Sequence, residues 1–171
     1  MNHVQTFDTV PDHLTALPYR SGVGIMLFNR KGEVLVAKRL DMTSDAWQMP
    51  QGGIDAGEVA STTALRELKE EIGTNNVEVI RESADWYTYE LPDSMIAKIW
   101  DGQYRGQKQK WFAMHFLGSD DEINIETEKP EFSEWKWIDM RLLPDIIVPF
   151  KKNLYRALID EFADCAPSLN N

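Results

Sequence analysis

The chain has 171 residues, 43% of them hydrophobic and 27% charged, which suits a single soluble domain with a sizeable core. Its 28 acidic residues outnumber its 18 basic ones, and the formal net charge of −10 makes the chain a poor candidate for wrapping duplex nucleic acid. A single cysteine and three scattered histidines exclude an intrachain disulfide and a multi-cysteine zinc site.

The chain carries no targeting signal that its sequence reveals. No apolar run approaches the roughly 20 residues that span a bilayer. The first 15 residues lack the cationic start and the apolar stretch of a secretory signal. We therefore expect a cytoplasmic protein without membrane contacts: one domain over residues 1–171, with an ordered core at about 18–162 and short tails. Residues 1–17 show no clear period, and we expect them to form a loose arm.

The first half of the chain predicts a hairpin, a short extended piece and a helix. An apolar run at 23–28 and a second at 33–37 flank a turn signal, Asn-Arg-Lys-Gly, which is typical of a β-hairpin. A third extended piece at 47–49 ends at the Pro-Gln-Gly-Gly that follows it. The clearest helix runs from about residue 58 to 72, with Gly73 as its C-cap.

The second half predicts further strands and a final helix. Strand-like segments recur at 77–80, 85–91, 109–117 and around 134–138. The last helix, at roughly 149–162, places Leu154, Leu158 and Phe162 at a spacing of four residues. There is no internal repeat and no linker, so the pattern predicts one α/β domain with a mixed sheet and at least two helices.

The helix at 58–72 carries an unusual set of acidic side chains. Its apolar positions Leu65, Leu68 and Ile72 are spaced to form one buried stripe. The acids lie on a different face, about 120° from that stripe at 100° per residue. They are Glu67, Glu70 and Glu71. The spacing predicts three carboxylates that project side by side from a helix anchored by its other flank.

These acids oppose helix stability. Like charges at this spacing cost roughly 0.2–0.5 kcal/mol per pair, and the last helical turn favours cations. A divalent cation such as Mg²⁺ would relieve the repulsion, because it binds carboxylate and phosphate oxygens. The alternative is an ordinary solvated acidic face. The preceding glycines Gly52, Gly53 and Gly57 favour a ligand site, because glycine permits sharp turns and close approach of the backbone.

The segment that contains these residues resembles the signature of the Nudix hydrolases. Every fixed position of that signature is matched at its spacing: Gly52, Glu58, Arg66, Glu67, Leu68, Glu70, Glu71 and Gly73. The one departure is Thr74, where the family usually has a bulky aliphatic residue. That departure affects packing after the helix and leaves the acidic positions intact.

The resemblance implies a fold, a reaction and a set of metal ligands. The fold is an α/β/α sandwich with a mixed sheet between helices. The reaction is hydrolysis of a diphosphate linkage in a nucleoside diphosphate attached to another group, with Mg²⁺ or Mn²⁺ as cofactor. The implied ligands are Glu67, Glu70 and Glu71, with the backbone carbonyl of Gln51 or Gly52.

Two further roles follow from the same signature. Glu58 and Arg66 would brace the loop of Gly53 and Gly57 through an ion pair. Glu70 or Glu71 would act as general base toward a water, which the metal makes more acidic.

Segments outside the signature resemble the bacterial RNA pyrophosphohydrolases and the closely similar asymmetric dinucleoside polyphosphate hydrolases. They are residues 18–20, 47–53, 106–112, 130–132, 135–137 and 148–152. By this resemblance Glu131 is a further metal ligand or base, and phosphates are met by Arg20, Lys110 and Lys151. Arg39 and Phe150 would sandwich a base, and Tyr89 is a further candidate for that pocket.

Each of these side chains also has an ordinary structural interpretation, as a surface cation, a core aromatic or one more acid in an acidic stretch. The leading functional hypothesis is removal of pyrophosphate from the 5′-triphosphate end of RNA, which needs only a few local cations. The alternative is asymmetric hydrolysis of diadenosine tetraphosphate and related dinucleotides. A non-catalytic nucleotide-binding module is disfavoured, because all the signature carboxylates are present. Protein partners and oligomeric state are not indicated by any motif.

Overall fold

The computed structural model describes residues 4–6, 16–41 and 45–167 of the chain. Its strands are β1 (Val4–Thr6), β2 (Tyr19–Phe28), β3 (Val34–Arg39), β4 (Gln51–Gly53), β5 (Val77–Glu82), β6 (Trp86–Glu90), β7 (Gly106–Phe116) and β8 (Phe132–Ile138). Its α-helices are α1 (Ala60–Ile72), α2 (Asp93–Ile96), α3 (Leu143–Ile146) and α4 (Lys152–Phe162). Short 3₁₀ turns are η2 (Trp100–Gly102), η3 (Asp120–Glu122), η4 (Met140–Leu142), η5 (Pro149–Lys151) and η6 (Ala163–Cys165).

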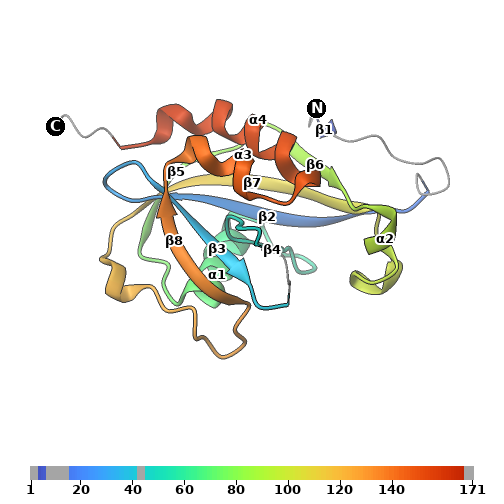
Figure 1. Cartoon of the computed structure of the whole chain (residues 1–171), viewed down its shortest axis with the longest axis horizontal. Helices are drawn as coiled ribbons and strands as arrows, with labels where there is room; N and C mark the ends of the chain where they lie inside the picture. Colours follow the sequence, from blue (N-terminus) through green and yellow to red (C-terminus); the bar gives the residue numbers. More distant parts are fainter. Residues whose placement is uncertain (1–3, 7–15, 42–44, 168–171) are drawn as a thin grey trace.

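These elements form a mixed sheet between two helical layers. The strand order is β1-β6-β7-β2-β3-β8, with β4 paired to β2 and β5 paired to β7. Helices α3 and α4 cover one face of the sheet, and α1 covers the other (Figure 1). This arrangement confirms the α/β/α sandwich with a mixed sheet that the sequence predicts.

The centre of the sheet is the long parallel pair β2–β7, in register from Tyr19↔Gly106 to Phe28↔His115. The predicted hairpin of β2 and β3 is present, and its recorded register is the single pair Phe28↔Val34 next to the turn. Farther from the turn, toward the start of β2, the strand pairs with β4 instead, through Gly22↔Gly53 and the two pairs that follow it. The two hairpin strands therefore diverge, and the glycine-rich strand β4 fills the space between them.

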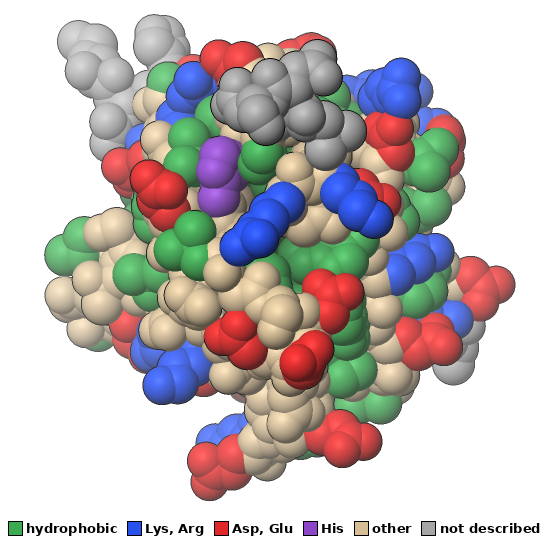
Figure 2. Space-filling view, turned by 90° about the vertical axis from the view of Figure 1, so that its left-hand side faces the viewer, with side chains coloured by type: hydrophobic (Ala, Val, Ile, Leu, Met, Phe, Trp, Pro, Cys, Tyr) green, Lys and Arg blue, Asp and Glu red, His purple; other side chains and the backbone are tan. Residues whose placement is uncertain are grey.

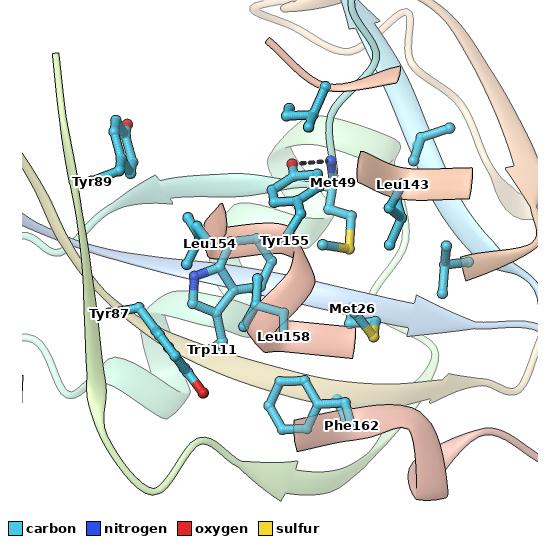
Figure 3. Close-up of a cluster of buried hydrophobic side chains, with 14 of the residues drawn as sticks. Met26, Met49, Tyr87, Tyr89, Trp111, Leu143, Leu154, Tyr155, Leu158 and Phe162 are labelled. Atoms are coloured by element: carbon cyan, nitrogen blue, oxygen red, sulfur yellow. Dashed lines mark hydrogen bonds between the residues drawn. The ribbon is translucent and has the colours of Figure 1, made fainter. Parts of the chain in front are cut away.

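Alternating side chains of β2 divide the interior into two cores. Val23, Ile25 and Leu27 point toward α1 and pack with its Leu68 and Ile72. The intervening residues of β2 point toward α4, whose Leu154, Leu158 and Phe162 are fully buried, as their spacing predicts. In this second core the Tyr155 hydroxyl accepts a hydrogen bond from the Met49 amide at 2.8 Å (Figure 3). The contact fixes the chain just before β4.

Helix α1 ends as predicted but begins later. Gly73 has a φ of 79°, and its amide donates to the Lys69 carbonyl, so it is the expected left-handed cap. The helix begins at Ala60 instead of 58, because the Glu58 amide closes a turn onto the Asp55 carbonyl. The last predicted helix divides into η5 and α4 at the same overall position.

Other elements differ from the sequence-based expectation. The extended piece at 47–49 is an isolated bridge, Ala37↔Gln48, and the strand itself is β4, three residues later. The loose arm expected at 1–17 includes strand β1, which pairs in parallel with β6, whereas residues 1–3 and 7–15 lie outside the described residues. The folded part extends beyond residue 162, because η6 places Cys165 in the interior. Helices α2 and α3 were not predicted.

The surface carries charges of both signs. At the end of the molecule where β2 and β7 finish, acidic and basic side chains alternate around apolar patches (Figure 2). This mixture differs from the one-signed basic stripe by which duplex nucleic acid is bound. Within the described part of the chain, none of the helices has the length and apolar character needed to cross a membrane.

Candidate active site

Strand β4 brings two glycines against charged side chains. A Cβ atom on Gly52 would lie 2.1 Å from Cδ of Glu67, and one on Gly53 would lie 2.1 Å from Nη2 of Arg20. A larger residue at either position would require the end of the Glu67 or the Arg20 side chain to move away. Gly57 has a φ of 77°, which supplies the turn toward α1. The glycines of the signature therefore allow Glu67 and Arg20 to lie directly on the backbone of this strand.

Arg66 braces the loop between β4 and α1. Its Nε and Nη2 donate to the two carboxylate oxygens of Glu58, each at 2.8 Å, and Nη2 also donates to the Gly53 carbonyl at 3.2 Å. Hydrogen bonding by Arg66 lowers the pKa of Glu58 to about 2. The ion pair implied by the signature is thus present, and it ties the loop to the helix in a bidentate geometry.

The three glutamates of α1, predicted to project side by side from one face, differ strongly in burial. Glu71 is buried, with 3% of its surface exposed, whereas the side chains of Glu67 and Glu70 are 13% and 57% exposed. The reason is the side on which α1 packs. Its buried stripe includes Ala64, Leu68, Glu71 and Ile72, and Leu65 is only half-buried. Because β4 lies along this side of the helix, Glu71 points into the protein.

Glu71 is a buried carboxyl group with an unsatisfied oxygen. Its Oε2 has no hydrogen-bond partner. Burial raises its pKa well above the usual value, and Glu131 and Glu67 raise the pKa further, while the Gln51 amide opposes them. The pKa of Glu67 is raised to about 7, chiefly by burial, against the opposing charge of Arg66. The negative charge of Glu71 is therefore poorly compensated, whereas Glu67 keeps an ion pair with Arg66 at 3.0 Å.

Glu131 brings a further acid to Glu71 from a distant part of the sequence. It lies in the segment before β8, and its carbonyl accepts a hydrogen bond from the Leu40 amide at 2.9 Å. A divalent cation fits this acidic set, because it would satisfy the orphaned oxygen of Glu71 and offset the mutual repulsion.

The glutamates of this site are not arranged in the geometry of a metal-coordination shell. Among the described residues, no group of three or more His, Cys, Asp or Glu side chains has a geometry that would hold a metal. Arg66 accounts for part of this, because its Nη1 binds Glu67 at 3.0 Å and Glu70 at 3.1 Å. The ligand set Glu67, Glu70, Glu71 and Glu131 therefore stays a prediction.

A pocket of about 690 Å³ opens near Glu71 and Glu131, whose charges act on two of its lining residues, Arg39 and Lys151. It brings together five of the residues singled out from the sequence: Arg39, Gln51, Tyr89, Phe150 and Lys151. They come from β3, β4, β6 and η5, which are far apart along the chain. This volume lies within the usual range for sites that take a small molecule.

Lys151 is the buried cation of the pocket. Its Nζ donates to Oε1 of Gln51 at 3.3 Å and lies 4.7 Å from the centre of the Tyr89 ring. Burial and the neighbouring Arg39 lower its pKa to about 7, against the attraction of Glu71. An anionic ligand next to Lys151 would favour the charged form of its ammonium.

Arg39, Tyr89 and Phe150 line the same pocket as Lys151. The guanidinium of Arg39 makes two hydrogen bonds of 2.7 Å to Asp41. The rings of Tyr89 and Phe150 lie 5.9 Å apart with an interplanar angle of 42°. The Tyr89 hydroxyl donates to Gln107 at 3.1 Å. A planar guanidinium and an aromatic face in one pocket are the groups on which a nucleobase stacks.

Lys110 is placed apart from the other predicted residues. Its Nζ lies 5.6 Å from the centre of the Trp86 ring and 3.4 Å from the Ala84 carbonyl. Because side chains alternate along β7, the neighbouring Gln107 and Gln109 point to the opposite face and are buried. The structure therefore does not bring Lys110 into the pocket.

Several pocket residues were not identified from the sequence. Half of them belong to the segment between β6 and β7: Leu91, Met95, Lys98, Ile99 and Trp100. Gln109 supports the pocket from behind, since its Nε2 donates to the lining residue Gln51 at 3.1 Å and to Gln107 at 2.6 Å. The Pro-Asp pair that starts α2 was the available signal for this segment, but nothing in the sequence shows which way the segment folds.

Comparison with known proteins identifies the class to which this fold and site belong. The NUDIX domain family matches residues 18–158, and the chain therefore belongs to the Nudix family. Within that family it is a pyrophosphohydrolase enzyme. Relatives named RNA pyrophosphohydrolase include one from Rhodospirillum rubrum, 51% identical over 91% of this chain and 94% of its own. A second, from Sphingopyxis alaskensis, is 53% identical over 85% of this chain and 94% of its own.

Solved structures share the fold at much lower identity. The C. elegans Ap4A hydrolase in a binary complex gives a TM-score of 0.62 at 19% identity, covering 85% of this chain and 98% of that one. The E. coli dihydroneopterin triphosphate pyrophosphohydrolase gives 0.63 at 21% identity, covering 87% and 99%. At these identities the likeness is one of fold.

Proposed function

We propose that the protein hydrolyses the 5′-triphosphate end of RNA, releasing pyrophosphate and leaving a 5′-monophosphate. The observation that carries the proposal is the position of the pocket of Arg39, Phe150 and Lys151 beside the acids Glu71 and Glu131. The pocket offers stacking and cationic groups for a nucleotide, and the acids suit a divalent cation. The relatives with about half of their residues identical carry the name RNA pyrophosphohydrolase, which supports RNA as the substrate.

The cofactor in this proposal is Mg²⁺ or Mn²⁺, held by Glu67, Glu70, Glu71 and Glu131, with the backbone carbonyl of Gln51 or Gly52. When bound, such a cation neutralises phosphate oxygens and lowers the pKa of an attacking water. Glu70 or Glu71 accepts the proton of that water as general base.

The protein's other groups orient the substrate. Arg20 and Lys151 bind phosphate oxygens, while Arg39 and Phe150 stack on a base, with Tyr89 beneath them. Gly53, Gly57 and the Glu58–Arg66 pair hold the loop in place. Lys110 is not part of the proposal, because its ammonium lies over Trp86, away from the pocket.

Competition kinetics test this proposal. The purified protein is given 5′-triphosphorylated RNA and diadenosine tetraphosphate together in Mg²⁺, and pyrophosphate, monophosphorylated RNA and nucleotides are quantified. We expect the RNA end to be cleaved with the higher kcat/KM. Absence of RNA cleavage, with the dinucleotide cleaved, overturns the choice of RNA and favours asymmetric dinucleotide hydrolysis. The control is Glu70→Gln, which we expect to lose Mg²⁺-dependent turnover with the fold retained.

A further inference from the structure

The segment between β6 and β7 forms one wall of the pocket and has an unusual backbone. Its ends are tied together, since the Leu91 amide donates to the Arg105 carbonyl at 2.9 Å. Between them, Trp100 and Asp101 have φ values of 52° and 57°, in the left-handed region that residues other than glycine seldom occupy. Trp100 lines the pocket from this segment.

Trp100 holds the guanidinium of Arg20. The Cζ atom of Arg20 lies 5.1 Å from the centre of the Trp100 ring, which is within the range of a cation–π contact. On its other side the guanidinium lies against β4, where a Cβ on Gly53 would require it to move away. Arg20 is thus held between an aromatic ring and bare backbone.

This environment differs from that of the other arginines near it. Arg39 pairs with Asp41 at 2.7 Å, and Arg66 pairs with Glu58 at 2.8 Å. No carboxylate among the residues that the structure describes pairs with Arg20. A ring face orients a guanidinium without occupying its five N–H donors, so the donors of Arg20 stay available for anionic oxygens.

The position of Arg20 links the pocket to the acids of α1. On the pocket side, Arg20 is close enough to oppose the burial that raises the pKa of Tyr89. On the other side, Arg20 contacts Gly53, whose carbonyl accepts a hydrogen bond from Arg66. A phosphate chain that runs from a base in the pocket toward Glu67 therefore passes the free donors of Arg20.

We propose that Trp100 is a positioning residue, which orients Arg20 toward the phosphates through its ring face without occupying any of the N–H donors of Arg20. This inference rests on the proposed function in one respect: the substrate must carry a chain of phosphates. It holds for an RNA 5′ end and for a dinucleoside polyphosphate alike.

A double-mutant cycle tests the inference. Trp100→Ala, Arg20→Ala and the double variant are compared for kcat and KM on the substrate that the wild type cleaves best. If Trp100 acts through Arg20, Trp100→Ala raises KM by about three- to thirtyfold with a smaller change in kcat, and the double variant is no worse than Arg20→Ala. Trp100→Phe keeps a ring face and restores most of the loss.

Two further measurements keep the test independent of folding and of the substrate. Trp137→Ala, which removes a half-buried tryptophan of β8, controls for general destabilisation, and thermal unfolding is recorded for every variant. Binding of inorganic tripolyphosphate, measured by calorimetry, repeats the cycle without turnover. Additive effects of the two substitutions, or a Trp100→Phe variant as weak as Trp100→Ala, overturn the inference. A wild type that does not cleave RNA overturns the proposed function, while the tripolyphosphate cycle still tests the role of Trp100.

Discussion

The acidic loop and helix at 51–73 and the walls of the neighbouring pocket are built in different ways. The first region is continuous in sequence, and one side chain, Arg66, ties together Gly53, Glu58, Glu67 and Glu70. The second is assembled from β3, the segment 91–105 and η5, which are far apart in the sequence and line one pocket in the folded protein. The reactive groups are thus fixed locally, while recognition depends on long-range packing.

This difference predicts two kinds of variant. Substitutions in the continuous region remove or displace charged groups next to the reacting bond, and they should lower kcat. Substitutions in the pocket walls change contacts to the nucleoside, and they should act mainly on KM.

The largest effect is expected from Glu71→Gln. Loss of the buried carboxylate should lower Mg²⁺-dependent kcat by about 10²- to 10⁴-fold, since it removes a metal ligand or the general base. Stability without metal should not fall, because the amide replaces a carboxyl whose Oε2 has no partner. Steady-state kinetics and urea unfolding in chelator measure the two quantities. Unchanged turnover contradicts the role of Glu71.

Arg66→Lys should lower kcat by about 10- to 100-fold. Lysine keeps the charge but cannot bind both oxygens of Glu58 and reach the Gly53 carbonyl at the same time. The loop should therefore lose its orientation, and kcat should fall more than KM rises. A matched control is Arg141→Lys, which disturbs a pair with Asp139 outside the site. Equal kcat and KM for Arg66→Lys and Arg141→Lys would show that the contacts of Arg66 with Glu58 and Gly53 have no role in turnover.

Phe150→Ala should act on the other region. It removes a ring that lies 5.9 Å from Tyr89 in the pocket, and loss of base stacking costs about 1–3 kcal/mol. We therefore expect KM to rise by about 5- to 150-fold with little change in kcat. A kinetic effect confined to kcat contradicts the assignment of Phe150 to the base.

A last expected effect concerns stability alone: a pH-dependent difference between the wild type and Lys151→Met. The pKa of Lys151 is lowered to about 7 in the folded state, below its unfolded value, so the unfolded chain binds the extra proton between these two pKa values. The wild type should therefore gain stability relative to the variant as pH rises from about 7 to 10, by about 1.4 kcal/mol per pH unit at most. Urea unfolding of both proteins in chelator across this range measures the difference. A difference that does not change with pH contradicts the burial of a titrating lysine.

Local patterns predicted the elements that depend on local rules. The left-handed cap at Gly73 and the buried spacing of Leu154, Leu158 and Phe162 follow from short-range geometry, and the structure has both. Strand β4 was missed because Gln-Gly-Gly has the composition of a turn. It becomes a strand only because β2 and β3 diverge, so that at Gly22 the edge of β2 opposite β7 is open for β4.

The same limit applies to the candidate site. The acids of α1 were found from their spacing, but the burial of Glu71 depends on where β4 packs, which helical periodicity does not show. Trp100 was not singled out at all. Its role rests on a left-handed backbone and a contact with Arg20, 80 positions earlier in the chain, and neither leaves a local pattern.

The account depends most on the acidic set around Glu71 as a site for a divalent cation. Binding of Mn²⁺ to the wild type and to Glu71→Gln, measured by electron paramagnetic resonance without substrate, tests it directly. We expect saturable binding to the wild type and at least about tenfold weaker binding to the variant. Equal Mn²⁺ binding by the two proteins would contradict the account.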